Sequence, residues 1–535
     1  MPADSSPALY PQVLLRNVRI VSVGGVPASD VPVDVRMRGG RIVGLAPSLA
    51  ADASDQDVHD GEGRWAIPGL WDHHVHLAQW ADTLARVDMT GTRSADEVLT
   101  RLRAHLDELP GSDRDSVVIG FGHRSATWPR QPTVAELDAV SGQHLVVLVS
   151  GDGHNGWLNS AALTMLGAPA TEGALAENDW FPVWGRLADL PGSREARDTA
   201  YRLAVSRAAA MGIVGVGDME FGAGFRDWPP RFAGGIRDLK VRVATYPDGL
   251  DAVLAAGLRS GDILGDSGGL VRMGPLKIIS DGSLNTRTAY CDEPYAGGSG
   301  LAYPCGLANY PASELTELAA RATKAGLRLA IHAIGDAAVA QALDVFEATG
   351  ATGTIEHAQL MRRADITRMA QLGVGASVQP AHLLDDRDVT AQCWPDRTDR
   401  CFPLRSMVDA GVAVLLGSDA PVSVLDPWLA MAAAVHRSAD EREPWNDAEA
   451  LTVEQALAAS TDRQPTLGVG SRADVVLLDA DPLVPPHPVG SVHLAGSVNP
   501  AGSAADSAPS AAAAQRLRAM PVGATYVGGR RTHRA

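Results

Sequence analysis

Short apolar segments recur along the middle of the chain, and stretches with helical periodicity separate most of them. Amphipathic stretches such as residues 312–326 and 336–350 are typical of helices that cover a sheet. Eight strands alternating with helices predict a parallel (β/α)8 barrel, with a doubly wound sheet as the alternative. The segments read as strands are residues 64–77, 213–220, 241–247, 274–282, 327–336, 353–359, 373–380 and 411–421.

Both ends of the chain are β-rich. Residues 13–23 and 31–47 alternate apolar and polar positions, and Gly39-Gly40 marks a tight turn. Residues 473–482 and 523–533 have a similar pattern near the other end. We therefore expect one small β domain built from residues 1–68 and 466–535, with the barrel occupying residues 69–465.

Two stretches do not follow the alternation of predicted strands and helices. Residues about 80–200 contain two further strand-like pieces, SVVIGFG and HLVVLVSG, and are expected to form an insertion after the first barrel strand. Residues about 482–515 are rich in Pro, Ala, Ser and Gly. Such a segment buries little apolar surface, so we predict a flexible loop without a chemical role.

The composition narrows the class of protein. Of the 535 residues 45% are hydrophobic, and the formal net charge is −17. An acidic chain argues against nucleic acid or an anionic membrane as a partner, because both require a basic face. The first residues lack a basic segment followed by an apolar core, and no apolar run reaches ~18 residues, so we expect a cytoplasmic protein. The four cysteines, Cys291, Cys305, Cys393 and Cys401, are expected to be free thiols.

The strongest chemical signal is His74-Val75-His76, at the end of the first predicted barrel strand. Side chains two residues apart on a strand point to the same face, so both imidazoles can reach one ion. Histidine is the most common metal ligand and suits Zn²⁺. The triplet alone is frequent by chance, and other residues must support it.

Four further polar residues lie at the predicted carboxyl ends of later strands: Lys277, His332, His357 and Asp419. Catalytic groups in a barrel come from the ends of several strands at this face. Each residue alone could be a hydrogen-bonded core residue, but together they predict a metal centre. Zn²⁺ lowers the pKa of bound water to ~7, and an aspartate within hydrogen-bond distance can take the proton.

Six segments resemble one family in their order along the chain: IPGLWDHHVHL, KIISDGSLNTRTA, IHAIGDAAV, IEHAQL, SVQPAH and LGSDAPV. The ordered set resembles the amidohydrolase superfamily, and within it the YtcJ-like branch, which includes N-substituted formamide deformylases. The resemblance implies a (β/α)8 TIM barrel with a small β-sandwich formed from both termini. His73, where a small residue is expected, would face away from the site by strand alternation.

The same resemblance implies one or two divalent ions, usually Zn²⁺. His74 and His76 would bind the more buried ion, and His332 and His357 the second. Lys277 would be carbamylated and bridge the two ions. Asp419 would bind the first ion and act as general acid and base. With a single ion, Lys277 would instead be an uncarbamylated cation next to the site.

Candidate substrate contacts come from three places. The stretch from Asp152 to Ser160 resembles a family motif, and His154 and Trp157 in it would line the substrate pocket, or the stretch is a structural loop. Gln379 and His382 follow the seventh barrel strand and are also expected to face substrate. Arg287 would pair with a substrate carboxylate, or is an ordinary surface arginine.

The function expected from this pattern is metal-dependent hydrolysis of a non-peptide C–N bond in a small molecule, such as an amide, an N-formyl or N-acyl amine, or a carbamate. The alternatives are an esterase, lactonase or deaminase on the same barrel, or a non-catalytic protein that kept the fold. The expected partner is a small-molecule substrate, with no nucleic acid and no membrane, and a homodimer is a possible assembly.

Overall fold

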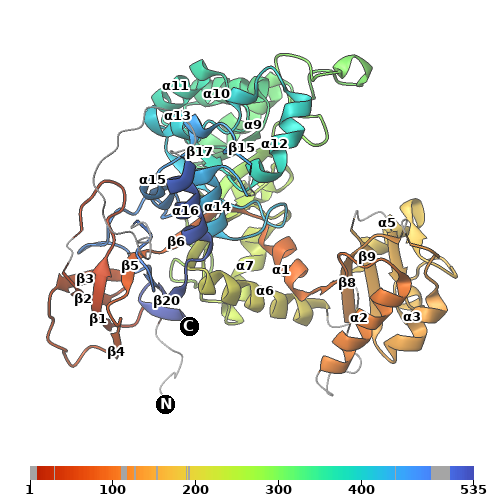
Figure 1. Ribbon diagram of the computed structural model, residues 1–535, viewed down its shortest axis with the longest axis horizontal. Helices are drawn as coiled ribbons and strands as arrows, with labels where there is room; N and C mark the ends of the chain where they lie inside the picture. Colours follow the sequence, from red (N-terminus) through yellow and green to blue (C-terminus); the bar gives the residue numbers. More distant parts are fainter. Residues whose placement is uncertain are drawn as a thin grey trace, which may run out of the picture. The chain divides into compact units, whose positions relative to one another are not determined.

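The computed structural model describes residues 9–28, 31–109, 117–125, 128–151, 155–187, 190, 193–439, 442–483 and 507–535 (Figure 1). The chain divides into two compact units. Unit 1 comprises Met1–Leu77 and Val205–Ala535, and unit 2 comprises Ala78–Ala204. All strands of the barrel and of the terminal sheet belong to unit 1.

The centre of unit 1 is an eight-stranded parallel sheet in which each strand pairs with the next along the chain. A backbone bridge between Val75 and Ala420 joins the first strand to the segment that follows the last one. The barrel and its eight strands are thereby confirmed, although residues 65–68 of the first predicted segment belong to another sheet. The strands are β6 (Leu70–Val75), β12 (Ile213–Asp218), β13 (Lys240–Thr245), β14 (Val271–Ile279), β15 (Leu329–Ala333), β16 (Gly353–His357), β17 (Gly375–Val378) and β18 (Val414–Leu416).

Helices alternate with these strands, because each parallel connection must return the chain to the same end of the sheet. The helix α10, for example, buries Ala338, Ala342 and Phe346. The helices of this layer are α7 (Gly224–Ala233), α8 (Leu250–Ala255), α9 (Ala312–Lys324), α10 (Asp336–Thr349), α11 (Arg363–Gln371), α12 (His382–Cys393), α13 (Leu404–Asp409), α14 (Pro427–His436) and α15 (Val453–Ala459).

Both ends of the chain form the second sheet of unit 1, as predicted. The strand β1 joins its two parts, because Val13–Val18 pair with β2 while Arg19 and Ile20 pair with β5. Gly39 and Gly40 have φ of 56° and 74° and turn the chain between β2 and β3. The strands are β1 (Val13–Ile20), β2 (Val33–Arg38), β3 (Arg41–Ala46), β4 (Asp57–Asp60), β5 (Trp65–Pro68), β19 (Val475–Leu478), β20 (Val522–Val527) and β21 (Arg530–Arg534).

Unit 2 lies between β6 and β12 in the sequence, so it is the insertion expected after the first barrel strand. It has its own five-stranded sheet and its own apolar core. The strands are β7 (Val87–Asp88), β8 (Val117–His123), β9 (Leu145–Ser150), β10 (Asn155–Leu158) and β11 (Leu175–Ala176). The helices are α2 (Ala95–Glu108), α3 (Val134–Ser141), α4 (Ser160–Met165) and α5 (Glu177–Trp184), and α1 (Leu77–Ala85) and α6 (Ser193–Ala210) cross the boundaries of the unit.

One expectation about the C-terminal region was partly wrong. Residues 507–515, predicted as the end of a loop, are the first part of the helix α16 (Ser507–Arg518). Alanine has the highest helix propensity, and its small side chain lets two helices approach closely. Here Ala514 and Leu517 are buried, and α16 packs on the alanine-rich α14. Residues 484–506 of the predicted loop lie outside the described residues.

Two further expectations concern the cysteines and membrane-spanning helices. The four cysteines are free thiols, as predicted. Within the described part of the chain, no helix is both long and apolar enough to span a bilayer.

Candidate metal centre

Three donor groups from distant parts of the sequence meet at the carboxyl ends of the barrel strands. His74 lies on β6, His357 ends β16, and Asp419 follows β18. One ligand atom of each lies within 4.8 Å of the other two, and all three residues are buried. The arrangement therefore offers two imidazoles and a carboxylate to a single ion.

His76 extends this cluster. Its Nε2 lies 3.3 Å from Oδ1 of Asp419, and Nε2 of His74 lies 3.4 Å from the same oxygen. Burial raises the pKa of Asp419, but the neighbouring His74, His76 and His357 outweigh it and hold that pKa well below its usual range. Asp419 is therefore ionised at neutral pH.

Lys277 lies inside the barrel on β14, and its side chain is 2% exposed. Its Nζ is 3.3 Å from Nε2 of His74. Among the described residues, no carboxylate forms an ion pair with it. Burial lowers the pKa of Lys277, and the more distant charges of Glu356 and Asp419 only partly oppose this effect. A larger fraction of this amine is therefore neutral than in water.

His332 on β15 lies beside His357, with 4.5 Å between the ring centroids. Its Nε2 is 3.4 Å from Oδ1 of Asp281. Burial, and then the charge of Lys277, lower the pKa of His332 to about 3. Burial and the neighbouring His332 also lower the pKa of His357. Neutral imidazoles are the form that binds metal ions.

The backbone is strained where two of these side chains leave their strands. His357, Ala358 and Asp419 have φ of 72°, 45° and 57°, in the left-handed region that residues other than glycine seldom occupy. Each such residue costs on the order of 1 kcal/mol, and strain of this kind clusters at functional sites. Here it accompanies two members of the cluster.

Glu356, the neighbour of His357 on β16, was not among the site residues expected from the sequence. It is fully buried, and its Oε2 accepts a hydrogen bond from Nδ1 of His74 at 2.7 Å. Its other oxygen accepts one from the Thr354 hydroxyl. Burial raises the pKa of Glu356, but the hydrogen bond and charge of His74 outweigh this and lower it to about 2. An acidic residue within an apolar strand was the available signal.

These contacts fit a divalent ion. Because Nδ1 of His74 donates to Glu356, its Nε2 keeps a lone pair on the side of Lys277 and Asp419. Nδ1 of His76 and Nδ1 of His357 are buried, and neither has a hydrogen-bond partner among the described residues. Imidazole and carboxylate donors suit zinc and other first-row divalent ions. His74, His357 and Asp419 could therefore hold one ion, and His76 lies beside them.

The structure places His382 next to this cluster. It begins α12, and its Nε2 is 4.0 Å from Oδ2 of Asp419. That nitrogen is buried and has no hydrogen-bond partner in the described chain. Gln379 is also buried, and its Nε2 donates to the carbonyl of Ser377 at 3.3 Å. Arg287 lies on the loop after β14 with φ of 55°, and no described contact ties it to the metal cluster.

Of the two candidates from the insertion, only Trp157 belongs to the described residues. Trp157 lies on β10, fully buried in the core of unit 2, and its Nε1 donates to the carbonyl of Thr133 at 2.9 Å. These contacts explain Trp157 as a packing residue of unit 2, and its contact with substrate stays a prediction. His154 lies outside the described residues.

A parallel barrel with imidazole and carboxylate donors at the carboxyl ends of its strands is an architecture of metal-dependent hydrolases. The model of the amidohydrolase family matches residues 57–533, and the chain belongs to this family. It is a hydrolase of the amidohydrolase superfamily.

Several known proteins are similar over most of the chain. An N-substituted formamide deformylase of Arthrobacter pascens is 29% identical, over 88% of this chain and 93% of its own length. The protein LONG AFTER FAR-RED 3 of Arabidopsis thaliana is 28% identical, over 83% of both chains. The crystal structure of an uncharacterized metal-dependent hydrolase from Pyrococcus furiosus is 25% identical, with a TM-score of 0.72 over 88% of this chain and all of the other.

Proposed function

We propose that this hydrolase cleaves a non-peptide C–N bond of a small molecule, such as an amide, an N-formyl or N-acyl amine, or a carbamate. The observation that carries the proposal is the meeting of His74, His357 and Asp419 within 4.8 Å in a buried site. The similar Arthrobacter pascens protein, by its name, removes formyl groups from N-substituted formamides, which is a C–N cleavage.

The ion proposed for this site is zinc, in one or two copies. A bound divalent ion supplies Lewis acidity, which makes water a nucleophile at neutral pH and polarises a carbonyl group. In the one-ion form, His74, His357 and Asp419 are proposed to hold the ion. In the two-ion form, His74, His76 and Asp419 are proposed to hold the more buried ion, and His332 and His357 the second. Glu356 fixes the orientation of His74 through the 2.7 Å hydrogen bond.

Whether Lys277 is carbamylated is proposed to determine whether the site holds two ions or one. In the two-ion form, its neutral Nζ attacks CO2, and a C–N bond forms as one C=O π bond opens. The nitrogen then loses a proton to water, which gives an anionic carbamate. The lowered pKa of the buried Lys277 favours this reaction, because only the neutral amine is nucleophilic. In the one-ion form, Lys277 stays a cation 3.3 Å from Nε2 of His74.

Asp419 is proposed to move the proton. Its carboxylate takes a proton from the attacking water and later gives it to the leaving nitrogen, so an amine departs and a carboxylic acid remains. Oδ1 lies near His74 and His76, while Oδ2 lies 4.0 Å from Nε2 of His382. Oδ2 is therefore the oxygen proposed to exchange the proton.

Substrate contacts are proposed for His382, Gln379 and Arg287, and from the insertion for His154 and Trp157. His382 has the best support, because its Nε2 lies 4.0 Å from Oδ2 of Asp419 and has no hydrogen-bond partner in the described chain. The ring nitrogens of His382 are proposed to exchange a hydrogen bond with the group that leaves the substrate.

The test measures metal content per chain and the release of primary amine from a panel of N-formyl and N-acyl amines. The expected result is one or two zinc ions with amine release, and loss of turnover in Asp419→Asn with the fold kept. For Lys277→Ala, loss of metal that bicarbonate and a short acid partly restore supports the carbamate. If only matched esters were turned over, the protein would be an esterase and not an amidohydrolase acting on C–N bonds. Wild-type rates in Asp419→Asn would contradict the proposed mechanism.

A further inference from the structure

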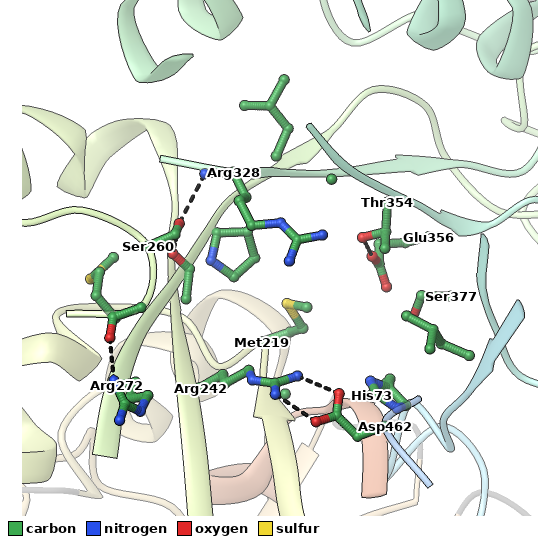
Figure 2. Close-up of a pocket in the computed structure, with 18 of the residues that line it drawn as sticks. His73, Met219, Arg242, Ser260, Arg272, Arg328, Thr354, Glu356, Ser377 and Asp462 are labelled. Atoms are coloured by element: carbon green, nitrogen blue, oxygen red, sulfur yellow. Dashed lines mark hydrogen bonds and ion pairs between the residues drawn. The ribbon is translucent and has the colours of Figure 1, made fainter. Parts of the chain in front are cut away.

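A cavity of about 460 Å³ lies among the barrel strands and extends from the amino ends of several strands to Met219 and Glu356 near the carboxyl ends of β12 and β16 (Figure 2). Its lining includes Arg272 near the start of β14, Leu329 at the start of β15 and Gly353 at the start of β16. The metal-binding candidates lie at the opposite, carboxyl ends of the strands. Glu356, which accepts the hydrogen bond from His74, also lines this cavity, so the cavity adjoins the proposed catalytic site. None of the lining residues is a proposed metal ligand, so a role for the cavity must be sought from its own residues.

The lining is unusually rich in arginine for a chain with a net charge of −17. Arg242 is neutralised, because it binds both oxygens of Asp462 at 2.8 and 2.7 Å and stacks on Trp71. Arg272 donates to the carbonyl of Gly261 at 2.6 Å (Figure 2). That contact leaves its charge without a carboxylate partner among the described residues.

Of the four arginines in the cavity lining, Arg328 and Arg463 have the fewest polar side-chain contacts. Both side chains are exposed to the cavity, and in the described part of the chain neither makes an ion pair or a side-chain hydrogen bond. The backbone of Arg328 is fixed by a hydrogen bond from its N–H to the Ser260 hydroxyl at 2.9 Å. Its guanidinium points toward the side of the cavity where Thr354 and Glu356 lie (Figure 2). Three guanidinium groups thus line one cavity without an ion pair in the described part of the chain. The carboxylate of Glu356 is in the same lining, but it is hydrogen-bonded to His74.

Two buried polar groups also face this cavity. His73 is 8% exposed and Ser377 is 2% exposed, and both belong to the lining. Nε2 of His73 and Oγ of Ser377 have no hydrogen-bond partner among the described residues. Leaving a buried polar group unpaired costs about 1–3 kcal/mol, so both groups favour a polar occupant.

We propose that this cavity binds a small organic anion through a phosphate or carboxylate group held by Arg272, Arg328 and Arg463. Planar guanidinium groups bind both kinds of oxyanion with two parallel hydrogen bonds. A volume of about 460 Å³ falls within the range of ligand pockets, roughly 300–1,000 Å³, so the occupant is larger than a single ion. His73 and Ser377 contact its polar part.

The experiment uses the full-length, metal-loaded protein and isothermal titration calorimetry with two probes, inorganic phosphate and succinate. The variants Arg328→Gln and Arg463→Gln each remove one guanidinium from the cavity. Arg103→Gln on α2 of unit 2 is the matched control, because it removes the same charge from an exposed position. Asp419→Asn tests whether the probe binds at the metal centre instead.

The expected result is saturable binding of at least one probe, weakened at least about tenfold by Arg328→Gln and by Arg463→Gln. Arg103→Gln and Asp419→Asn should leave the affinity unchanged. The probe that binds more tightly identifies the oxyanion that the site prefers. No binding of either probe up to about 10 mM would overturn the proposal. Binding that survives both arginine changes, or that Asp419→Asn abolishes, would overturn it as well.

Discussion

The carboxylate of Glu356 holds the imidazole of His74 in one orientation, and this pair supports a prediction at the scale of single residues. Glu356→Gln replaces the charged acceptor with a neutral amide of the same size, so the chain should still fold. Metal affinity should fall roughly 10- to 100-fold, because the partner that orients the ligand is weakened. Metal retained after dialysis against a buffered chelator measures the effect. Glu347→Gln, on the exposed face of α10, is the control, and equal losses in both variants would contradict the role of Glu356.

The buried imidazole of His73 supports a second prediction at the scale of single residues, on the pH dependence of stability. Burial lowers its pKa to about 4, while the unfolded chain titrates near 6.5. As pH falls from 7.5 to 5.5 the unfolded state gains a proton that the folded state does not, so stability is lost. His73→Phe keeps a ring beside Trp71 and removes this titration. Between these pH values the wild type should lose roughly 1.3 kcal/mol more unfolding free energy than the variant. Urea titrations in phosphate-free buffer test this, and parallel pH profiles would refute it.

At the scale of elements, the barrel was readable from the sequence because every strand of a parallel barrel is a short, nearly continuous apolar run. His74, Lys277, His332, His357 and Asp419 were visible as polar residues at the ends of such runs. Their meeting point then followed from the rule that catalytic groups gather at the carboxyl ends of barrel strands. The apolar runs and the polar residues at their ends are local in the sequence. The rule about the carboxyl ends of barrel strands brings them together in one site.

Other features depend on contacts that no local pattern encodes. The bond of Glu356 to His74 joins β16 to β6, which do not pair in the sheet. The cavity among the barrel strands combines arginines from three strand regions and from the loop after α15. The low-complexity sequence of the first part of α16 predicts a loop, and only its packing on α14 explains why it is a helix. In each case the partner, and not the segment itself, determines the role.

The helix α16 also allows a prediction at this scale. Leu517 is fully buried where α16 packs on α14, and Gln515 is exposed on the same helix. Leu517→Ala should lower the unfolding free energy by about 2–5 kcal/mol, because it removes buried methyl groups and leaves a cavity. Gln515→Ala should have almost no effect. Urea unfolding followed by circular dichroism measures both variants, and an unchanged midpoint for Leu517→Ala would show that the segment behaves as a loose loop.

At the scale of the whole molecule, the division into two units makes metal removal informative. The candidate ligands of either ion, from His74 to Asp419, all belong to unit 1, whereas unit 2 has its own sheet and core. An ion that binds only the folded state stabilises it by about 2.7 kcal/mol when its free concentration is 100 times its dissociation constant. Chelation should therefore speed amide hydrogen exchange in β6 and β16 and leave β8 and β9 of unit 2 unchanged. Added zinc should reverse the change. Exchange that speeds up equally in both units would show that the ion stabilises the chain elsewhere, and unchanged exchange in β6 and β16 would argue against a structural contribution of the metal to the barrel.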